Sequence, residues 1–270
     1  MITLLDSVRR YADAHADGQG LAQTPIPGLA LVRATAPSGL VHAVYRPLVC
    51  LLVQGSKNVT MGAQEFAFSE GDSLVVTADV PIVSRVTRAS VAAPYYSLVL
   101  ELDLAVIAEL AVEMGTGRAA DEAPMRVEPT DAEVAEAAAR LMRLLERPNS
   151  VRILQAQLVR EMHYWLLAGK HASAIRRLGW PESHVQRVSR AVSVLRAEYA
   201  KPLPVERLAA IAGMSLSSFH QHFRAITSLS PLQFQKQLRL IEARRMMLAD
   251  GASASSAAFA VGYESVPQFT

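Results

Sequence analysis

Four side chains that can form hydrogen bonds recur at helical spacing between residues 217 and 224. Ser217, His220, Gln221 and Arg224 stand at i, i+3, i+4 and i+7, so they share one face of a helix. In the major groove of DNA, Gln can pair with adenine, Ser or His can bond several base edges, and Arg reaches phosphate or guanine. The pattern favours a DNA-reading helix, with an ordinary solvated helix face as the alternative.

The residues around this stripe predict the two helices of a helix-turn-helix. The first helix should stop at Gly213, and Ser215 should cap the second. The apolar positions that should face inward are Val205, Leu208, Ala209 and Ala212 in the first helix and Phe219, Phe223 and Ile226 in the second. These elements would position the polar stripe on the outer side of the second helix.

A related unit follows at an offset of 49 residues, ending in "VGYESVPQFT". Between the two units, Ser230 and Pro231 predict the start of a helix that runs to about Ala249. Such a helix spans roughly 28 Å at 1.5 Å per residue. That length approaches the ~34 Å turn of B-DNA, so two reading helices could enter successive major grooves.

Charge supports a nucleic-acid partner for the C-terminal third. Residues 181–270 carry 10 Lys plus Arg against 6 Asp plus Glu, whereas residues 1–180 carry 17 against 19. A basic module suits phosphate binding, although the surplus is modest. One cysteine, Cys50, excludes an internal disulfide and a cysteine-rich metal site.

The N-terminal part predicts an α+β organisation. Short apolar runs at about ten-residue spacing favour a sandwich or small β barrel over 26–102, and helices are expected over 103–178. Two apolar stripes flanking "ERPNS" predict a helical hairpin over 131–170, packed on its own domain or forming a homodimer. The linker is expected in "RRLGWPESH", which separates domains 1–178 and 183–270.

From Ser183 to Thr270 the sequence resembles the AraC/XylS-type bacterial transcription regulators, in "LAAIAGMSLSSFHQHFRAITSLSPLQFQKQLRLIEARRMML" and "SAAFAVGYESVPQF". The resemblance implies an all-α domain of two helix-turn-helix units that bind promoter DNA. It implies base-facing roles for Ser217, His220 and Gln221, and positions nearer the DNA backbone for Ser218 and Arg224. Val266, Pro267 and Thr270 would begin the second recognition helix, which we expect to be truncated.

The stretches "RPLVCLLVQGSKNVTMG", "EGDSLVVTADVPIVSRVTRAS" and "PYYSLVLELD" are similar to the cupin-like effector domains of one subgroup of this family. That likeness implies a β barrel that binds a small molecule. Strand parity suggests Tyr45, Leu52 and Tyr96 as pocket residues. Cys50, on the same expected strand as Leu52, is a further pocket candidate that could sense electrophiles, with an ordinary buried core residue as the alternative. We expect no cofactor and no metal, because His42 alone falls in the β zone without metal-ligand spacing.

The sequence therefore predicts a DNA-binding transcriptional regulator, not an enzyme, whose promoter occupancy or contact with RNA polymerase responds to an effector. Two alternatives stay open: a dimeric ligand-binding protein that does not touch DNA, and a cupin-type enzyme. With no apolar run of membrane length and no signal peptide pattern, a cytoplasmic location is expected. The sequence identifies neither effector nor operator, nor activation against repression.

Overall fold

The computed structural model describes residues 3–115, 124–179 and 183–269 of the chain. Its contacts divide the chain into two compact units. The first, here named the sheet unit, comprises residues 1–41, 46–77 and 83–181. The second, the helical unit, comprises residues 42–45, 78–82 and 182–270.

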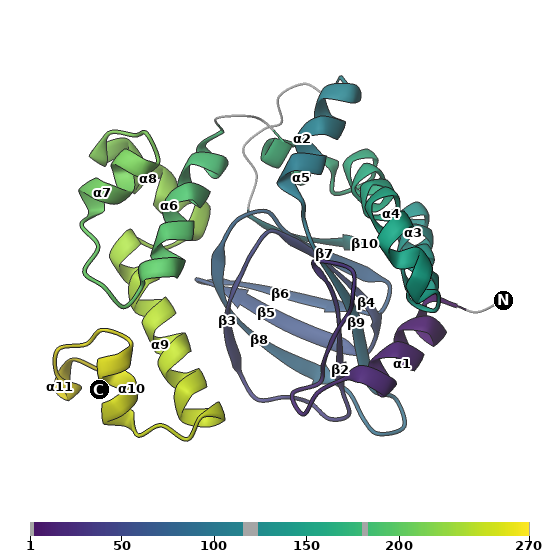
Figure 1. Cartoon of the computed structure of the whole chain (residues 1–270), viewed down its shortest axis with the longest axis horizontal. Helices are drawn as coiled ribbons and strands as arrows, with labels where there is room; N and C mark the ends of the chain where they lie inside the picture. The colour runs from purple at the N-terminus through teal and green to yellow at the C-terminus, as the bar shows by residue number, and fades with distance from the viewer. Residues whose placement is uncertain (1–2, 116–123, 180–182, 270) are drawn as a thin grey trace. The chain divides into compact units, whose positions relative to one another are not determined.

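The described strands form two sheets (Figure 1). The larger sheet has the order β1-β2-β9-β4-β7-β10, and the smaller has the order β3-β8-β5-β6. The strands are β1 Leu21–Gln23, β2 Leu29–Ala34, β3 Val41–Tyr45, β4 Leu48–Gln54, β5 Ser56–Met61, β6 Gln64–Ser69, β7 Asp72–Val76, β8 Val80–Arg88, β9 Tyr95–Glu101 and β10 Met125–Pro129. This arrangement agrees with the expected α+β class with an N-terminal β-rich part.

Strand β4 forms the centre of the larger sheet. It pairs antiparallel with β7 on one side and with β9 on the other. Its residues from Leu48 to Leu52 are all buried, so side chains of both parities lie in apolar surroundings. A strand covered on both faces needs apolar residues at consecutive positions, which explains the run "LVCLLV".

Two strands lie outside the range 26–102 in which strands were expected, and β10 corrects the prediction that 103–178 is helical. β10 pairs antiparallel with β7, from Met125 opposite Val76 to Pro129 opposite Asp72. Its five residues include Arg126 and Glu128, whose side chains pair with each other at 2.6 Å. So short and charged a segment carries little strand signal of its own, because its conformation depends on pairing with β7.

The first helix of the sheet unit is α1, where Thr3 and Asp6 form a capping box. Asp103 caps α2, and α3 and α4 pack along each other as the predicted hairpin (Figure 1). The hairpin is tied by Arg140, whose Nε donates to Glu161 Oε2 at 3.0 Å. The helices are α1 Leu4–His15, α2 Leu104–Glu113, α3 Ala132–Leu145, α4 Pro148–Ala168 and α5 Ala172–Arg176, followed by the 3-10 turn η1 Arg177–Gly179.

Two buried histidines connect these helices to the rest of the sheet unit. His163 Nε2 accepts from the backbone N–H of Asp103 at 2.9 Å, and its Nδ1 donates to Val159 O at 2.7 Å. His171 Nε2 lies 2.8 Å from Ser73 Oγ on β7. Burial lowers the pKa of His163 and lowers the pKa of His171 to about 4, so both rings are neutral near pH 7.

The helical unit follows the predicted pattern closely. Ser183, Ser215, Ser230 and Ser253 each cap a helix by accepting a backbone N–H. The helices are α6 His184–Glu198, α7 Val205–Ile211, α8 Leu216–Thr227, α9 Pro231–Ala249, α10 Ala254–Ala260 and α11 Val266–Phe269. The long α9 therefore separates one helix pair, α7 and α8, from a second pair, α10 and α11 (Figure 1).

Candidate functional site

The polar stripe expected to read DNA lies on the outer face of α8. Ser217, His220, Gln221 and Arg224 are all exposed, as their helical spacing predicted. Ser218 is half-buried, and its backbone N–H donates to the Ser215 hydroxyl at 3.3 Å in the N-cap. The structure thus brings four of the five proposed first-unit residues together on one exposed face, with Ser218 at its edge.

An aromatic core holds the opposite face of α8. Phe219 and Phe223 are fully buried and their ring centroids lie 5.3 Å apart. Phe223 also meets Phe234 of α9 edge-on at 5.6 Å. Such pairs add about 0.5–1.5 kcal/mol beyond the area that they bury. Because these rings leave α8 little freedom to rotate, the orientation of the polar face is fixed.

The turn between α7 and α8 is held by a residue of α6. Gly213 has a φ of +61°, which lies in the left-handed region that favours glycine. Arg187 Nε donates to the carbonyl of the preceding Ala212 at 2.8 Å. A cation at the end of α7 satisfies a carbonyl that the helix itself leaves free. Sequence reasoning missed this contact because its partners are 25 residues apart.

A stacked pair of histidines also joins α6 to α8. The rings of His184 and His222 lie 3.6 Å apart between centroids, at an angle of 14°. His222 is half-buried, so it does not belong to the polar face of α8. No periodic pattern within either helix could have indicated this pairing, because one ring comes from each helix.

The second helix pair, like the first, has a left-handed glycine between its helices. Gly262 has a φ of +91° in the turn after α10, and α11 covers four residues. Of the proposed DNA-contacting residues here, Val266 is half-buried and Pro267 is exposed, while Thr270 lies outside the described residues. Between the pairs, α9 has 19 residues, a length of about 28 Å, as expected for a spacer near one turn of DNA.

The proposed pocket residues of the sheet unit do not all share one surface. Cys50 lies opposite Val99 and Leu52 lies opposite Ser97, so these side chains occupy one face of the larger sheet. Tyr96 lies on the other face, where its hydroxyl donates to Asp13 of α1 at 2.7 Å. The structure therefore separates Tyr96 from Cys50 and Leu52. Tyr45 ends β3 and is half-buried, in a segment that groups with the helical unit.

Cys50 is held as a neutral thiol. Its side chain is buried beside Ser97, and burial raises the pKa of the Cys50 thiol above its ordinary value. Because the thiolate is the reactive form, this environment does not favour sensing of electrophiles by Cys50. The face shared by Cys50, Leu52 and Ser97 is instead a small, mostly apolar surface with a hydroxyl and a thiol.

The described residues offer no metal centre: no three His, Cys, Asp or Glu side chains among them are placed to hold an ion. His42, Glu65 and Asp72 accordingly form no such group. Across the part of the chain that the structure describes, none of the helices has the length and apolar character needed to cross a bilayer.

Comparison with known families assigns both parts of the chain. Residues 25–174 match the family described as the AraC-type transcriptional regulator N-terminus, which is more than half of the chain. The chain belongs to the AraC-type transcriptional regulators. Residues 208–270 match a helix-turn-helix domain, which covers α8 with its polar face and the whole second helix pair of this AraC-type chain.

Individual relatives agree with the AraC-type assignment. A 39-residue segment is 56% identical to the HTH-type transcriptional regulator YneL of Escherichia coli, covering 14% of this chain and 66% of that relative, just under two thirds of its length. An apo ToxT variant of Vibrio cholerae is similar in fold, with a TM-score of 0.59 and 6% identity over 92% of this chain and 93% of ToxT. ToxT bound to an unsaturated fatty acid has a TM-score of 0.54 at 6% identity, over 90% of this chain and 87% of ToxT.

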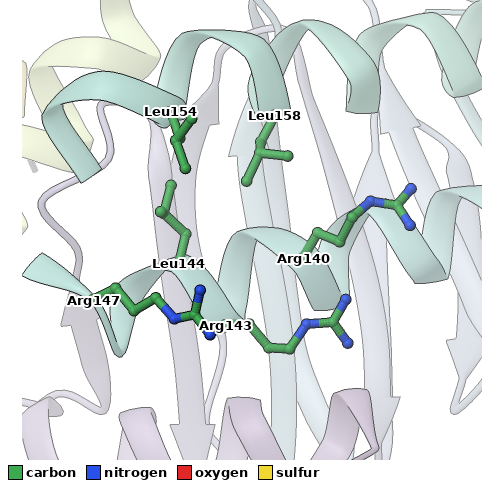
Figure 2. Close-up of a pocket in the computed structure, with 6 residues that line it drawn as sticks. All are labelled: Arg140, Arg143, Leu144, Arg147, Leu154 and Leu158. Atoms are coloured by element: carbon green, nitrogen blue, oxygen red, sulfur yellow. The ribbon is translucent and has the colours of Figure 1, made fainter. Parts of the chain in front are cut away.

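The helical hairpin of this AraC-type regulator carries an open groove of about 190 Å³. Figure 2 shows Leu154 and Leu158 of α4 pointing toward Leu144 of α3, with the arginines of α3 alongside. The predicted apolar stripe of α3 is buried, but Leu154 of the α4 stripe is 45% exposed and its neighbour Ile153 is 70% exposed. The groove is lined by Arg140, Arg143, Leu144, Arg147, Leu154 and Leu158.

Proposed function

We propose that this chain regulates transcription by binding promoter DNA through α8, and that a small-molecule effector bound by the sheet unit changes promoter occupancy. The observation that carries the proposal is the exposed polar face of α8, fixed from behind by an aromatic core. The role is that of a regulator rather than an enzyme. Its place of action is the cytoplasm, where bacterial promoters are accessible.

The chemistry of the α8 face suits base readout at the centre and phosphate contact at the edges. Gln221 can accept from and donate to adenine in the major groove, and His220 and Ser217 can each bond a base edge. Arg224, one turn further along, can reach guanine or phosphate. Ser218, at the N-terminal end of α8, is suited to a phosphate contact, since helix N-termini favour anions.

The effector is proposed to be small and mostly apolar. Cys50, Leu52 and Ser97 present such a surface in the sheet unit. ToxT has been solved with an unsaturated fatty acid and with (E)-4-(8-methylnaphthalen-1-yl)but-3-enoic acid, both carboxylic acids on apolar bodies. Compounds of that chemistry are therefore the first effectors to test on this chain. Bound effector would act through the different affinities of two states of the regulator.

Fluorescence anisotropy of the full chain tests DNA binding. Duplex DNA from upstream of its own gene is compared with a scrambled duplex over a series of salt concentrations. We expect specific binding that weakens steeply with salt, because phosphate contacts release counterions. Gln221→Ala should remove the preference for the upstream duplex. Equal, Gln221-independent binding of both duplexes would contradict the proposal.

We further propose that the chain dimerises through the 131–170 hairpin. Ile153, Leu154 and Tyr164 leave an apolar strip of α4 open to solvent, and such patches commonly mark interaction sites. Sedimentation velocity should show a dimer that Leu154→Glu dissociates, while Leu248→Glu, at a leucine of α9 that is more exposed than Leu154, leaves it intact. A salt-insensitive dimer that never binds DNA would instead favour the ligand-binding protein considered above.

A further inference from the structure

Within the helical unit, the backbone directly after α6 is contacted both by α9 and by the second helix pair. A helix leaves its last carbonyls without partners in the helix. Here the carbonyls of Tyr199, Ala200 and Lys201, directly after α6, accept hydrogen bonds from side chains of α9. The segment 199–201 is therefore bound to α9 through its backbone.

Two side chains one turn apart on α9 make these bonds. Gln235 Nε2 donates to Tyr199 O at 2.9 Å and to Lys201 O at 2.7 Å, and the residue is buried. Arg239 Nε donates to Tyr199 O at 2.8 Å, and its Nη2 donates at 3.4 Å to the carbonyls of Ala200 and Lys201. A guanidinium also interacts favourably with the negative end of the α6 dipole.

The second helix pair reaches the same segment from another direction. A Cβ at Gly262, in the turn between α10 and α11, would lie 1.9 Å from the carbonyl oxygen of Ala200, so the two backbones are in direct contact. The Arg239 guanidinium lies 5.6 Å from the centroid of the Tyr263 ring, within the range of a cation–π interaction. Arg239 thus contacts both α6's end and the second pair.

The first helix pair is tied to α6 as well. Arg207 of α7 donates to both carboxylate oxygens of Glu198, at 3.1 and 2.8 Å. Arg187 of α6 holds the turn before α8, as described above. Both helix pairs therefore contact α6 or the segment that follows it. The first pair contacts α6 itself, and the second pair contacts the segment 199–201.

We propose that Arg239, supported by Gln235, is a positioning residue that sets the orientation of the second helix-turn-helix relative to the first. The inference rests on the proposed function, because the orientation matters for reading two grooves of DNA. Without the guanidinium, the contact at Gly262 would depend on the Gln235 bonds to the segment 199–201 and on the small core formed by Ala243 of α9 with Ala257 and Val261. The spacing of the two reading surfaces would then be loose.

Distances between spin labels in the full chain directly test whether Arg239 sets the orientation of the second helix pair. Labels are placed at Ala225→Cys on α8 and Ala260→Cys on α10, both exposed, in a Cys50→Ala background. We expect one narrow distance peak for the otherwise unchanged chain and loss of that single peak in Arg239→Met. Lys236→Met, an exposed cation on the same helix, should keep the narrow peak. An equally narrow peak in Arg239→Met would overturn the proposal.

Controls separate positioning from folding. A label pair within the first helix pair, Glu206→Cys with Ala225→Cys, should stay narrow in Arg239→Met. Arg239→Lys retains the cation and one donor and should give an intermediate width, whereas Gln235→Leu should broaden the peak by removing the supporting bonds. Broadening in the control pair, with no rescue by Arg239→Lys, would indicate general unfolding and contradict a positioning role.

A DNA measurement distinguishes failure of this inference from failure of the proposed function. On duplexes that the full chain selects from a random library, Arg239→Met should weaken binding by about tenfold, the worth of one charge-assisted hydrogen bond. Shorter duplexes that carry only the part of the selected site contacted by α8 should bind the unchanged chain and Arg239→Met with equal affinity. If the unchanged chain selects no DNA, the proposed function fails. The label distances still test the positioning role of Arg239.

Discussion

The two helix-turn-helix units of this regulator share a glycine turn but hold it differently. At Gly213, an added Cβ would meet the tip of the Arg187 side chain at 3.3 Å, and that side chain can move. At Gly262, the same Cβ would meet the backbone carbonyl of Ala200 at 1.9 Å. At the first turn, an added side-chain atom can be accommodated by movement of Arg187. At the second turn, the backbone of Ala200 leaves no room for such an atom.

Their cores differ in the same sense. The first unit buries Phe219 and Phe223 completely, and these two rings form an aromatic core with the buried Phe234 at the start of α9. The second buries alanines and one valine, and Phe259 remains 55% exposed. One motif can therefore be stabilised by large side chains of its own or by close contact with an adjacent helix, and the second solution makes it dependent on that helix.

The largest expected effect is the loss of the aromatic core in the first unit. Phe223→Ala should lower the free energy of unfolding of the helical unit by about 4 kcal/mol, because it leaves a cavity among packed rings. Phe259→Ala, the matched change in the second unit, should cost less than about 1 kcal/mol, because that ring is mostly solvated. Urea unfolding followed by circular dichroism measures both. Equal losses would remove the distinction between the cores.

For the glycine turns, the larger loss of stability should come from the substitution in the second unit. Gly262→Ala must displace the Ala200 backbone and adopt a left-handed conformation, so we expect a loss of about 3 kcal/mol or more in the local stability of α10. Gly213→Ala should cost only about 1 kcal/mol, since a flexible Arg187 can yield. Amide hydrogen exchange of α10 and α7 reports each turn separately. A costlier Gly213→Ala would contradict the contacts described here.

DNA affinity should distinguish the reading surfaces. Gln221→Ala should weaken specific binding by about 1–3 kcal/mol, the worth of a bidentate base contact. Gln268→Ala on α11 should have a smaller effect, since the buried core of the second unit consists of small residues that fix a helix less firmly than the rings behind α8. Gln64→Ala, on an exposed position of the sheet unit, serves as the control in anisotropy titrations. A larger effect of Gln268→Ala would move the main reading surface to the second unit.

The smallest effects should be equal in the two units. Ser215 and Ser253 cap α8 and α10 by the same bond, from the backbone N–H three residues on, at 3.3 and 3.1 Å. Ser215→Ala and Ser253→Ala should each cost about 1 kcal/mol in thermal or urea unfolding. If Ser253→Ala costs nothing, contacts with the segment 199–201 and with α9 stabilise the second unit without help from the cap, and the contrast becomes sharper.

Much of the helical unit could be predicted because its signals are local. The caps at Ser215 and Ser230 correctly gave the starts of α8 and α9, and the apolar periodicity gave the end of α9 near Ala249. The polar face of α8 followed from the same periodicity. β10 could not be predicted in this way, because five residues with two charges become a strand only by pairing with β7.

The contacts that sequence reasoning missed join residues far apart in the chain. His184 with His222, and Arg239 with the end of α6, depend on helix packing that no single-helix pattern encodes. The placement of Tyr96 failed for a related reason. Parity along one strand does not give the register between strands, and the observed register puts Ser97, not Tyr96, opposite Leu52.

Because His163 and His171 are buried, the unfolded sheet unit binds protons more tightly at these two imidazoles than the folded unit does. Their pKa values in the folded chain lie below the ordinary 6.5, at about 4 for His171. Stability is therefore complete above about pH 6.5 and declines as pH falls toward 4, because only the unfolded chain binds the extra protons. Acidification should thus favour unfolding of the sheet unit by mass action.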